Sequence, residues 1–205
     1  MDPVLPNLRD FPIGISELGF FIQDGLLSEL TRGVLLDEAQ SRHAAGGFRP
    51  AMVGKGLRKK AVESIRGDEI YWIDHWDQSP YHLVRPTIDA IMLQSRRDLF
   101  LPVKRFEGHF VRYPEGAFYK KHYDRHRGNP SRLLSSVIYL GDWMHGDGGE
   151  LMLYRKGAAP VTIEPKPGRM VVFDSSIQHE VLLTACIRWS LTGWFRDDID
   201  PVVQL

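Results

Sequence analysis

The chain is poor in the residue type that builds disulfide frameworks and thiolate metal sites. Its 205 residues include a single cysteine, Cys186. A lone thiol cannot form an internal disulfide, a CxxC redox pair or a zinc cage of several thiolates. This cysteine usage is typical of proteins from a reducing compartment, so we expect a cytoplasmic protein.

An excess of charge of one sign and long apolar runs are also absent. The 26 Lys and Arg residues balance the 26 Asp and Glu residues, whereas a dedicated nucleic-acid binder usually has a basic surplus. No stretch approaches the ~18 apolar residues that span a bilayer. The N-terminus lacks the basic and then apolar pattern of a secretory signal. We therefore expect neither a nucleic-acid partner nor a membrane association.

Hydrophobic residues make up 43% of the chain, enough to bury a sizeable core. We expect one domain over residues 1–205, with a helical support region at about 1–105 and a catalytic core at about 106–197. In the first part, Gly19–Asp24 has the composition of a strand. Apolar residues at helical spacing predict helices over Leu27–His43 and Pro86–Leu99.

The second part alternates short runs rich in β-branched and aromatic residues with turn sequences containing Gly, Pro, Asn and Asp. So many short strands at this spacing predict a sandwich or a barrel. With helices in front of them, the chain is mainly β (α+β), and we expect a double-stranded β-helix, or jelly roll, with N-terminal helices packed on one sheet. The predicted strands are Phe106–Tyr113, Leu133–Leu140, Glu150–Tyr154, Pro160–Glu164, Arg169–Phe173, Glu180–Leu183 and Ile187–Phe195.

The segment Arg49–Glu69 is basic and has few apolar residues in any period. It predicts a loop. Such a loop is either a solvated connector or a lid that grips a substrate beside a site.

Two of the eight histidines, His122 and His179, stand apart as candidate metal ligands. His122 and Asp124 form the pattern H-Y-D, which on an extended chain places an imidazole and a carboxylate on one face. His179 lies near a strand at the other end of the β-rich region. Two imidazoles and one carboxylate with open coordination positions form the facial triad of non-haem Fe(II) oxygenases, whereas a structural zinc site is closed by four ligands.

A basic residue follows the third candidate ligand. Arg188 comes 9 residues after His179 (188 − 179), in the segment IRWSLTGWF. A guanidinium there could bind the far carboxylate of a dicarboxylate through two hydrogen bonds. That pattern is typical of 2-oxoglutarate-dependent oxygenases.

Seven segments in family order resemble prolyl 4-hydroxylases related to the hypoxia-inducible-factor hydroxylases, in the compact form of the bacterial members. They span most of the chain between Ile65 and Phe195, and the N-terminal 40 residues resemble the family only in a general way. The segments are IRGDEIYWID, RYPEGAFYKKHYD, SRLLSSVIYLGDW, GGELMLY, EPKPGRMVVFDS, HEV and RWSLTGWF.

The resemblance implies a role for each matching position. His122, Asp124 and His179 would bind Fe(II), and Arg188 with Tyr139 would bind the C5 carboxylate of 2-oxoglutarate. The remaining matches divide into co-substrate pocket and substrate contacts. The pocket positions are Tyr113, Val181, Thr192 and Trp194, and the substrate-binding positions are Arg66, Asp68 and Arg132.

The resemblance further implies an enzyme that uses Fe(II), 2-oxoglutarate and O2, with ascorbate as a reductant, and releases succinate and CO2. The substrate would be a prolyl residue in an exposed loop of a protein, with elongation factor Tu as a candidate by analogy with bacterial relatives, and we expect a monomer. Oxygen sensing is a role that the family suggests. Two alternatives stay open: an oxygenase acting on a small molecule, free amino acid or alkylated base, and a non-catalytic iron or 2-oxoglutarate sensor.

Overall fold

Two antiparallel sheets form the body of the protein. The computed structural model describes residues 7–52, 64–127 and 129–198. Within these residues the larger sheet has seven strands in the order β1-β9-β6-β11-β4-β3-β2, and the smaller has four in the order β5-β10-β7-β8. The strands are β1 (Phe20–Gln23), β2 (Arg49–Pro50), β3 (Glu69–Ile73), β4 (Arg105–Tyr113), β5 (Tyr119–His122), β6 (Arg132–Tyr139), β7 (Leu151–Tyr154), β8 (Val161–Ile163), β9 (Met170–Asp174), β10 (Gln178–Val181) and β11 (Arg188–Arg196).

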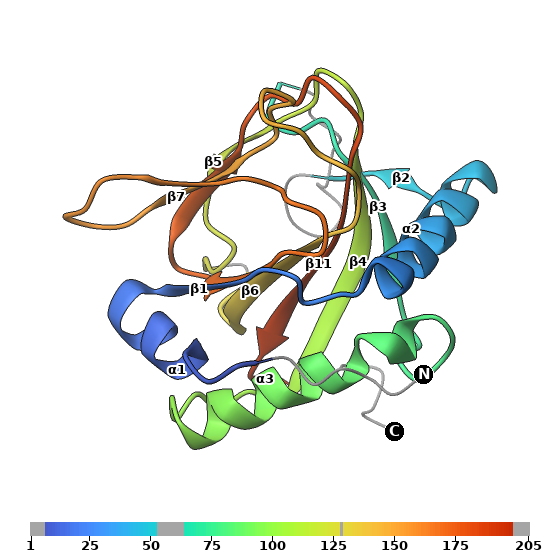
Figure 1. Cartoon of the computed structure of the whole chain (residues 1–205). Coiled ribbons are helices and arrows are strands. Elements are labelled where there is room, and N and C mark those ends of the chain that lie inside the picture. Colours follow the sequence, from blue (N-terminus) through green and yellow to red (C-terminus); the bar gives the residue numbers. More distant parts are fainter. Residues whose placement is uncertain (1–6, 53–63, 128, 199–205) are drawn as a thin grey trace.

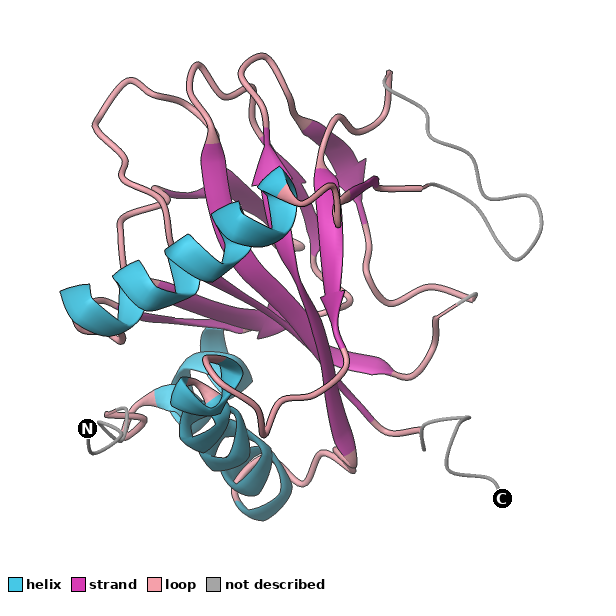
Figure 2. Cartoon of the chain, turned by 90° about the vertical axis from the view of Figure 1, so that its right-hand side faces the viewer, coloured by secondary structure: helices cyan, strands magenta, loops and turns pink. Residues whose placement is uncertain are grey.

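Helices cover one face of the large sheet (Figures 1 and 2). They are α1 (Phe11–Ile13), which continues into the π-helical turn η1 (Gly14–Leu18), then α2 (Glu29–Ala44), the 3₁₀ turn η3 (Tyr81–Leu83) and α3 (Arg85–Arg97). Helix α2 begins where the Ser28 hydroxyl accepts a hydrogen bond from the Thr31 N–H, which satisfies an end donor that no helical carbonyl can reach. Proline in the first turn of α3 suits its fixed φ.

Successive side chains along each central strand point to opposite faces of the sheet, and the two faces have different surroundings. In β6, Leu134 and Ile138 pack under the helices in the main hydrophobic core, together with Leu35 of α2 and Ile91 of α3. The alternate residue Val137 faces the space between the two sheets. The same alternation in β4 and β11 places one side of each strand in the core and leaves the other side to line the inside of the jelly roll.

The predicted jelly roll with helices on one sheet is confirmed, and both long helices lie where periodicity placed them. The predicted loop over Arg49–Glu69 is wrong at both ends, because Arg49–Pro50 forms β2 and Glu69 begins β3. Residues 53–63 of that loop lie outside the described residues. Strand β10 begins two residues earlier than predicted, so His179 lies within it.

The sequence also gave no indication of η1 or β5 as regular elements. Strand β5 reads Tyr-Lys-Lys-His and lies at the edge of the small sheet with its two lysines exposed. It pairs with β10, so that His122 and His179 are direct partners across the two strands. This pairing brings the candidate ligands together.

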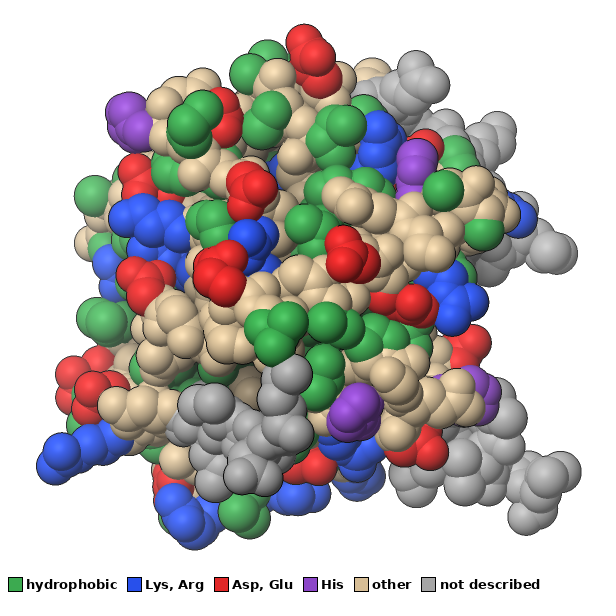
Figure 3. Space-filling view, turned by 45° about the vertical axis from the view of Figure 1, so that its right-hand side comes forward, with side chains coloured by type: hydrophobic (Ala, Val, Ile, Leu, Met, Phe, Trp, Pro, Cys, Tyr) green, Lys and Arg blue, Asp and Glu red, His purple; other side chains and the backbone are tan. Residues whose placement is uncertain are grey.

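Acidic and basic side chains are mixed over the face drawn in Figure 3, in keeping with the balanced composition. Among the described residues, we find no helix with the length and apolarity needed to cross a membrane.

Candidate metal centre and adjoining pocket

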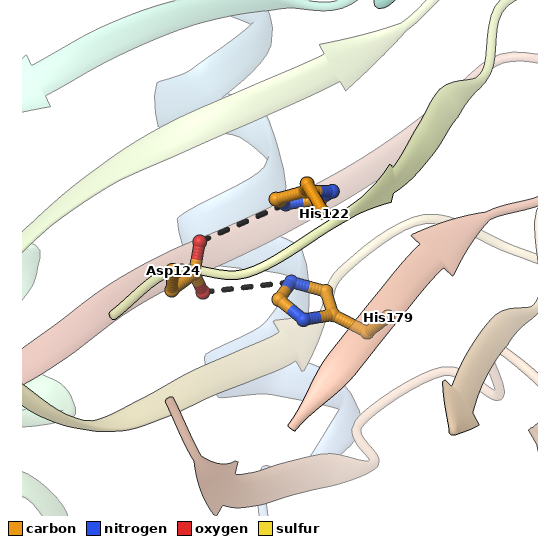
Figure 4. Close-up of side chains that lie close together, drawn as sticks. All are labelled: His122, Asp124 and His179. Carbon is orange, nitrogen blue, oxygen red and sulfur yellow. Dashed lines mark ion pairs between the residues drawn. The ribbon is translucent and has the colours of Figure 1, made fainter. Parts of the chain in front are cut away.

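Three side chains from the two ends of the jelly-roll region converge on one point. His122 ends β5, Asp124 follows two residues later, and His179 comes from β10. Their potential ligand atoms all lie within 4.8 Å of one another. The Nε2 atom of His122 is 3.7 Å from Asp124 Oδ1, and that of His179 is 3.5 Å from Asp124 Oδ2 (Figure 4).

Backbone carbonyls fix both imidazole rings. The Nδ1 atom of His122 lies 2.8 Å from the carbonyl oxygen of Lys120, and that of His179 lies 3.0 Å from the carbonyl of Ile177. A carbonyl can only accept, so each Nδ1 carries a proton, and Nε2, which faces Asp124, is the nitrogen that each ring can offer to a metal. Stacking on Tyr119 also holds His122, with ring centroids 3.6 Å apart. Both rings therefore present the atom that a metal ligand needs.

Asp124 is buried and ionised. Burial acts to raise the pKa of this carboxyl, but His179, His122, Arg132 and the hydroxyl of Ser135 together hold it below its ordinary value. The Ser135 hydroxyl donates to Asp124 Oδ2 at 2.6 Å. Burial also lowers the pKa of His122 to about 3, so this ring is uncharged at neutral pH. Two imidazoles and one carboxylate fit a divalent iron with open positions.

A pocket of about 1150 Å³ opens beside these three residues. It is lined by eleven of the twelve residues that the sequence singled out. They are Arg66, Asp68, Tyr113, His122, Asp124, Arg132, His179, Val181, Arg188, Thr192 and Trp194. The twelfth, Tyr139, is fully buried in the core between the sheets.

Tyr139 nevertheless lies against the pocket through Arg188. The Arg188 guanidinium is 4.9 Å from the centre of the Tyr139 ring and 5.0 Å from that of Tyr113. The Tyr139 hydroxyl and the Arg188 Nε are both buried without a hydrogen-bond partner. Unpaired buried polar atoms cost free energy, so this end of the pocket is built to receive an anionic group that pairs with both. The far carboxylate of 2-oxoglutarate has that chemistry.

The three predicted substrate-binding residues also line the pocket. Arg66 and Asp68 form a two-pronged ion pair, with Nε to Oδ1 at 2.7 Å, and the Arg66 guanidinium lies over the Tyr119 ring. Arg132 stacks on Trp194, with its guanidinium carbon 3.4 Å from the ring centroid. The structure thus joins Arg66 with Asp68 and Arg132 with Trp194.

Two residues of this region were not singled out from the sequence. Ser135 holds Asp124 from the large sheet and also lies 2.8 Å from the hydroxyl of Ser175. Its signal was the presence of two serines inside an otherwise apolar strand. His109 lines the pocket and is 3% exposed. A lone histidine in a strand gives no such signal, because it resembles an ordinary structural histidine.

Comparison with known proteins gives consistent matches. The family model described as the 2OG-Fe(II) oxygenase superfamily matches residues 108–196. The structure is similar to a Pseudomonas putida prolyl-4-hydroxylase, with a TM-score of 0.84 and 35% identity over 94% of this chain and 100% of that chain.

Two animal proteins are more distant. A prolyl hydroxylase from Trichoplax adhaerens, solved with a hypoxia inducible factor peptide fragment, has the same fold with a TM-score of 0.82 and 24% identity, covering 92% of this chain and 88% of that one. A hypoxia-inducible factor prolyl hydroxylase of Caenorhabditis elegans is 27% identical over 200 residues, which cover 89% of this chain. The match takes in 27% of that relative, so the chain spans about a quarter of its length.

Proposed function

The chain belongs to the 2OG-Fe(II) oxygenase superfamily, and from this premise we propose that it hydroxylates a prolyl residue of a protein substrate. The chain is an oxidoreductase that resembles prolyl hydroxylases and has the iron-binding triad of its family. The prolyl substrate is the finer step. Its main support is the similarity to the Pseudomonas putida prolyl-4-hydroxylase, which runs through the whole length of that chain.

Different residues of the pocket would bind the iron and the far carboxylate of the co-substrate. We assign iron binding to His122, Asp124 and His179, whose Nε2 and carboxylate atoms face one another. We assign the C5 carboxylate of 2-oxoglutarate to Arg188 and Tyr139, because both have an unpaired buried polar atom. Tyr113, Val181, Thr192 and Trp194 would form the walls around the co-substrate.

When bound, Fe(II) and 2-oxoglutarate supply the oxidising chemistry: O2 gives one oxygen atom to the substrate C–H bond and one to 2-oxoglutarate, which leaves as succinate and CO2. The protein fixes the positions of the partners. It also excludes water, since the side chains around Arg188 are buried. The three ligands leave room for the chelating co-substrate and for dioxygen.

A protein substrate would approach from the Arg66 side of the pocket. The Arg66–Asp68 pair and Arg132 line this side and provide charged and stacked surfaces for a peptide loop. The Trichoplax adhaerens relative was solved with a peptide fragment, which supports a peptide as the class of substrate. We propose a protein with an exposed proline loop, with elongation factor Tu as the first candidate to test.

The experiment compares peptide masses of soluble proteins from cells that express the wild type or His179→Ala. We expect a prolyl peptide that gains one oxygen atom with the wild type alone. Purified elongation factor Tu, incubated with the purified enzyme, tests the candidate directly. If purified wild type converts 2-oxoglutarate while no prolyl peptide gains mass, the prolyl assignment is wrong and small molecules become the substrate class.

A further inference from the structure

Four side chains form a continuous wall along the substrate side of the pocket. They come from neighbouring strands of the large sheet: Arg132 from β6, Trp194 from β11, His109 from β4 and Trp72 from β3. We call this set the stacked wall. Arg132 lies 3.4 Å from the centre of the Trp194 ring, and the His109 ring lies 5.2 Å from Trp194 and 4.6 Å from Trp72.

The strand register explains why these side chains share one face. His109 is the direct cross-strand partner of Trp72 on one side and of Thr192 on the other. Trp194 is two residues beyond Thr192, so it points to the same side of the sheet. All these side chains line the pocket that adjoins the metal centre.

The stacked wall contains three polar atoms that nothing in the described protein satisfies. Arg132 Nε, Trp194 Nε1 and His109 Nδ1 are buried and have no hydrogen-bond partner. An arginine or tryptophan nitrogen can only donate, and a neutral histidine can donate or accept. Three unpaired atoms in adjoining side chains are too many for a surface that only packs. A ligand with carbonyl oxygens would pair with the donors.

The far end of the stacked wall reaches solvent. Arg132, Trp194 and His109 are each mostly buried, whereas Trp72 is 44% exposed at the pocket rim. Burial lowers the pKa of His109 to about 3, so its ring is uncharged at neutral pH. The wall is therefore flat, aromatic and uncharged between Trp194 and the rim. This surface suits an apolar, planar group and disfavours a positively charged one, because Arg66 and Arg132 already place positive charge near His109.

We propose that the stacked wall is the docking surface for the peptide segment beside the target proline, and that His109 determines which residue is accepted there. The segment lies extended, its carbonyl oxygens face the unpaired donors, and an aromatic, prolyl or aliphatic side chain packs over His109 and Trp72. This inference rests on the proposed prolyl function and adds the chemistry of the flanking residue.

The test uses synthetic peptides of eleven residues with one central proline. One flanking position at a time carries Phe, Leu, Gly, Glu or Lys, and hydroxylation is followed by the mass gain of one oxygen. The enzymes are the wild type, His109→Leu, His109→Asn and Trp72→Ala. Phe100→Ala is the matched control, because Phe100 is an exposed aromatic residue outside the pocket lining.

For the wild type we expect Phe and Leu to be preferred over Gly and Lys at one flanking position. His109→Leu and Trp72→Ala should raise the KM for the preferred peptides about tenfold and flatten the preference. The KM for 2-oxoglutarate should rise less than the KM for the peptide, since neither side chain is assigned to the co-substrate. His109→Asn, which restores a polar atom close to the imidazole Nδ1, should recover part of the loss, and Phe100→Ala should match the wild type.

A failure of the docking surface and a failure of the prolyl function would give different results. If the wild type hydroxylates these peptides and both wall variants keep its preference, the stacked wall is not the docking surface, while the prolyl function stands. If the wild type hydroxylates neither these peptides nor any cellular prolyl peptide, the proposed function is wrong and this inference falls with it. Trp72→Ala keeps the test decisive if the buried His109 variants do not fold.

Discussion

The hydroxyl of Ser135 donates a 2.6 Å hydrogen bond to Oδ2 of Asp124. The two residues belong to different parts of the jelly roll, since Ser135 lies in the middle of β6 and Asp124 follows the short edge strand β5. The central strand thus holds the one carboxylate of the metal centre in place. A hydrogen-bonded carboxylate loses less freedom when it binds an ion, because its orientation is already set.

Ser135→Ala should therefore weaken metal binding without unfolding the protein. We expect a loss of about 10- to 100-fold in affinity, the usual effect of removing a hydrogen bond to a metal ligand. Calorimetric titration of the metal-free protein with Mn(II) measures it. Ser136→Ala is the matched control, because the neighbouring hydroxyl contacts the Gly193 carbonyl on the other face of the strand. Equal affinities for the two variants would show that Ser135 does not orient Asp124.

Arg188 and Tyr139 should separate co-substrate binding from iron binding. Arg188→Ala removes the charged partner of the 2-oxoglutarate C5 carboxylate, and a hydrogen bond to a charged group is worth about 1.5–3 kcal/mol. We expect the KM for 2-oxoglutarate to rise about 10- to 100-fold, and Tyr139→Phe to raise it less. Mn(II) affinity should stay at the wild-type value in both. An unchanged KM in Arg188→Ala would refute the assignment of the carboxylate to this residue.

Two glycines should respond to alanine in opposite directions. A Cβ at Gly193, in the central strand β11, would lie 2.2 Å from Phe106 Cζ and 2.5 Å from the Glu107 carbonyl oxygen. Backbone cannot move aside cheaply, so Gly193→Ala should destabilise the fold by at least about 1–3 kcal/mol. Gly33→Ala in α2 meets nothing within 4 Å and should stabilise it by about 0.5–1 kcal/mol. Urea unfolding of both variants checks the signs, and a stable Gly193→Ala would contradict the packing seen around Phe106.

How much of the fold could be predicted from the sequence depends on how each helix or strand is stabilised. Strands such as β6 and β11 bury both faces and are rich in apolar or aromatic residues, so composition identified them. Strand β5 could not be found in this way, because its lysines are exposed and its pairing with β10 depends on residues more than fifty positions away. Short edge strands owe their structure to the neighbour that they join.

The residues of the candidate site also differ in whether the sequence alone could indicate them. His122 and Asp124 share a local spacing, and Arg188 stands at a recognisable distance from His179, so the sequence indicated these residues. His109 has no such local partner. Its neighbours Trp72 and Trp194 lie on flanking strands from distant parts of the chain, and only the sheet register brings the three rings together. Contacts set by register cannot be read from one strand alone.

The buried imidazole of His109 should also make stability depend on pH. Burial, with the positive charges of Arg66 and Arg132, lowers the pKa of His109 from 6.5 to about 3. In the unfolded chain the ring takes up a proton as the pH falls through about 6.5, while the folded protein keeps it neutral. The unfolded state binds more protons across this interval, so the free energy of unfolding decreases as the pH falls below about 6.5.

His109→Met removes this component. Between pH 7 and pH 5 the free energy of unfolding should fall by about 2 kcal/mol less in His109→Met than in the wild type. Urea unfolding at several pH values, with a chelator present so that metal binding adds nothing, measures the difference. His109→Gln packs differently but also lacks the titrating group, so both variants should show the same reduced slope even where their absolute stabilities differ. A wild-type slope in both variants would mean that His109 takes up its proton in the folded protein as readily as in the unfolded chain, and the uncharged character of the stacked wall would then be lost below about pH 6.5.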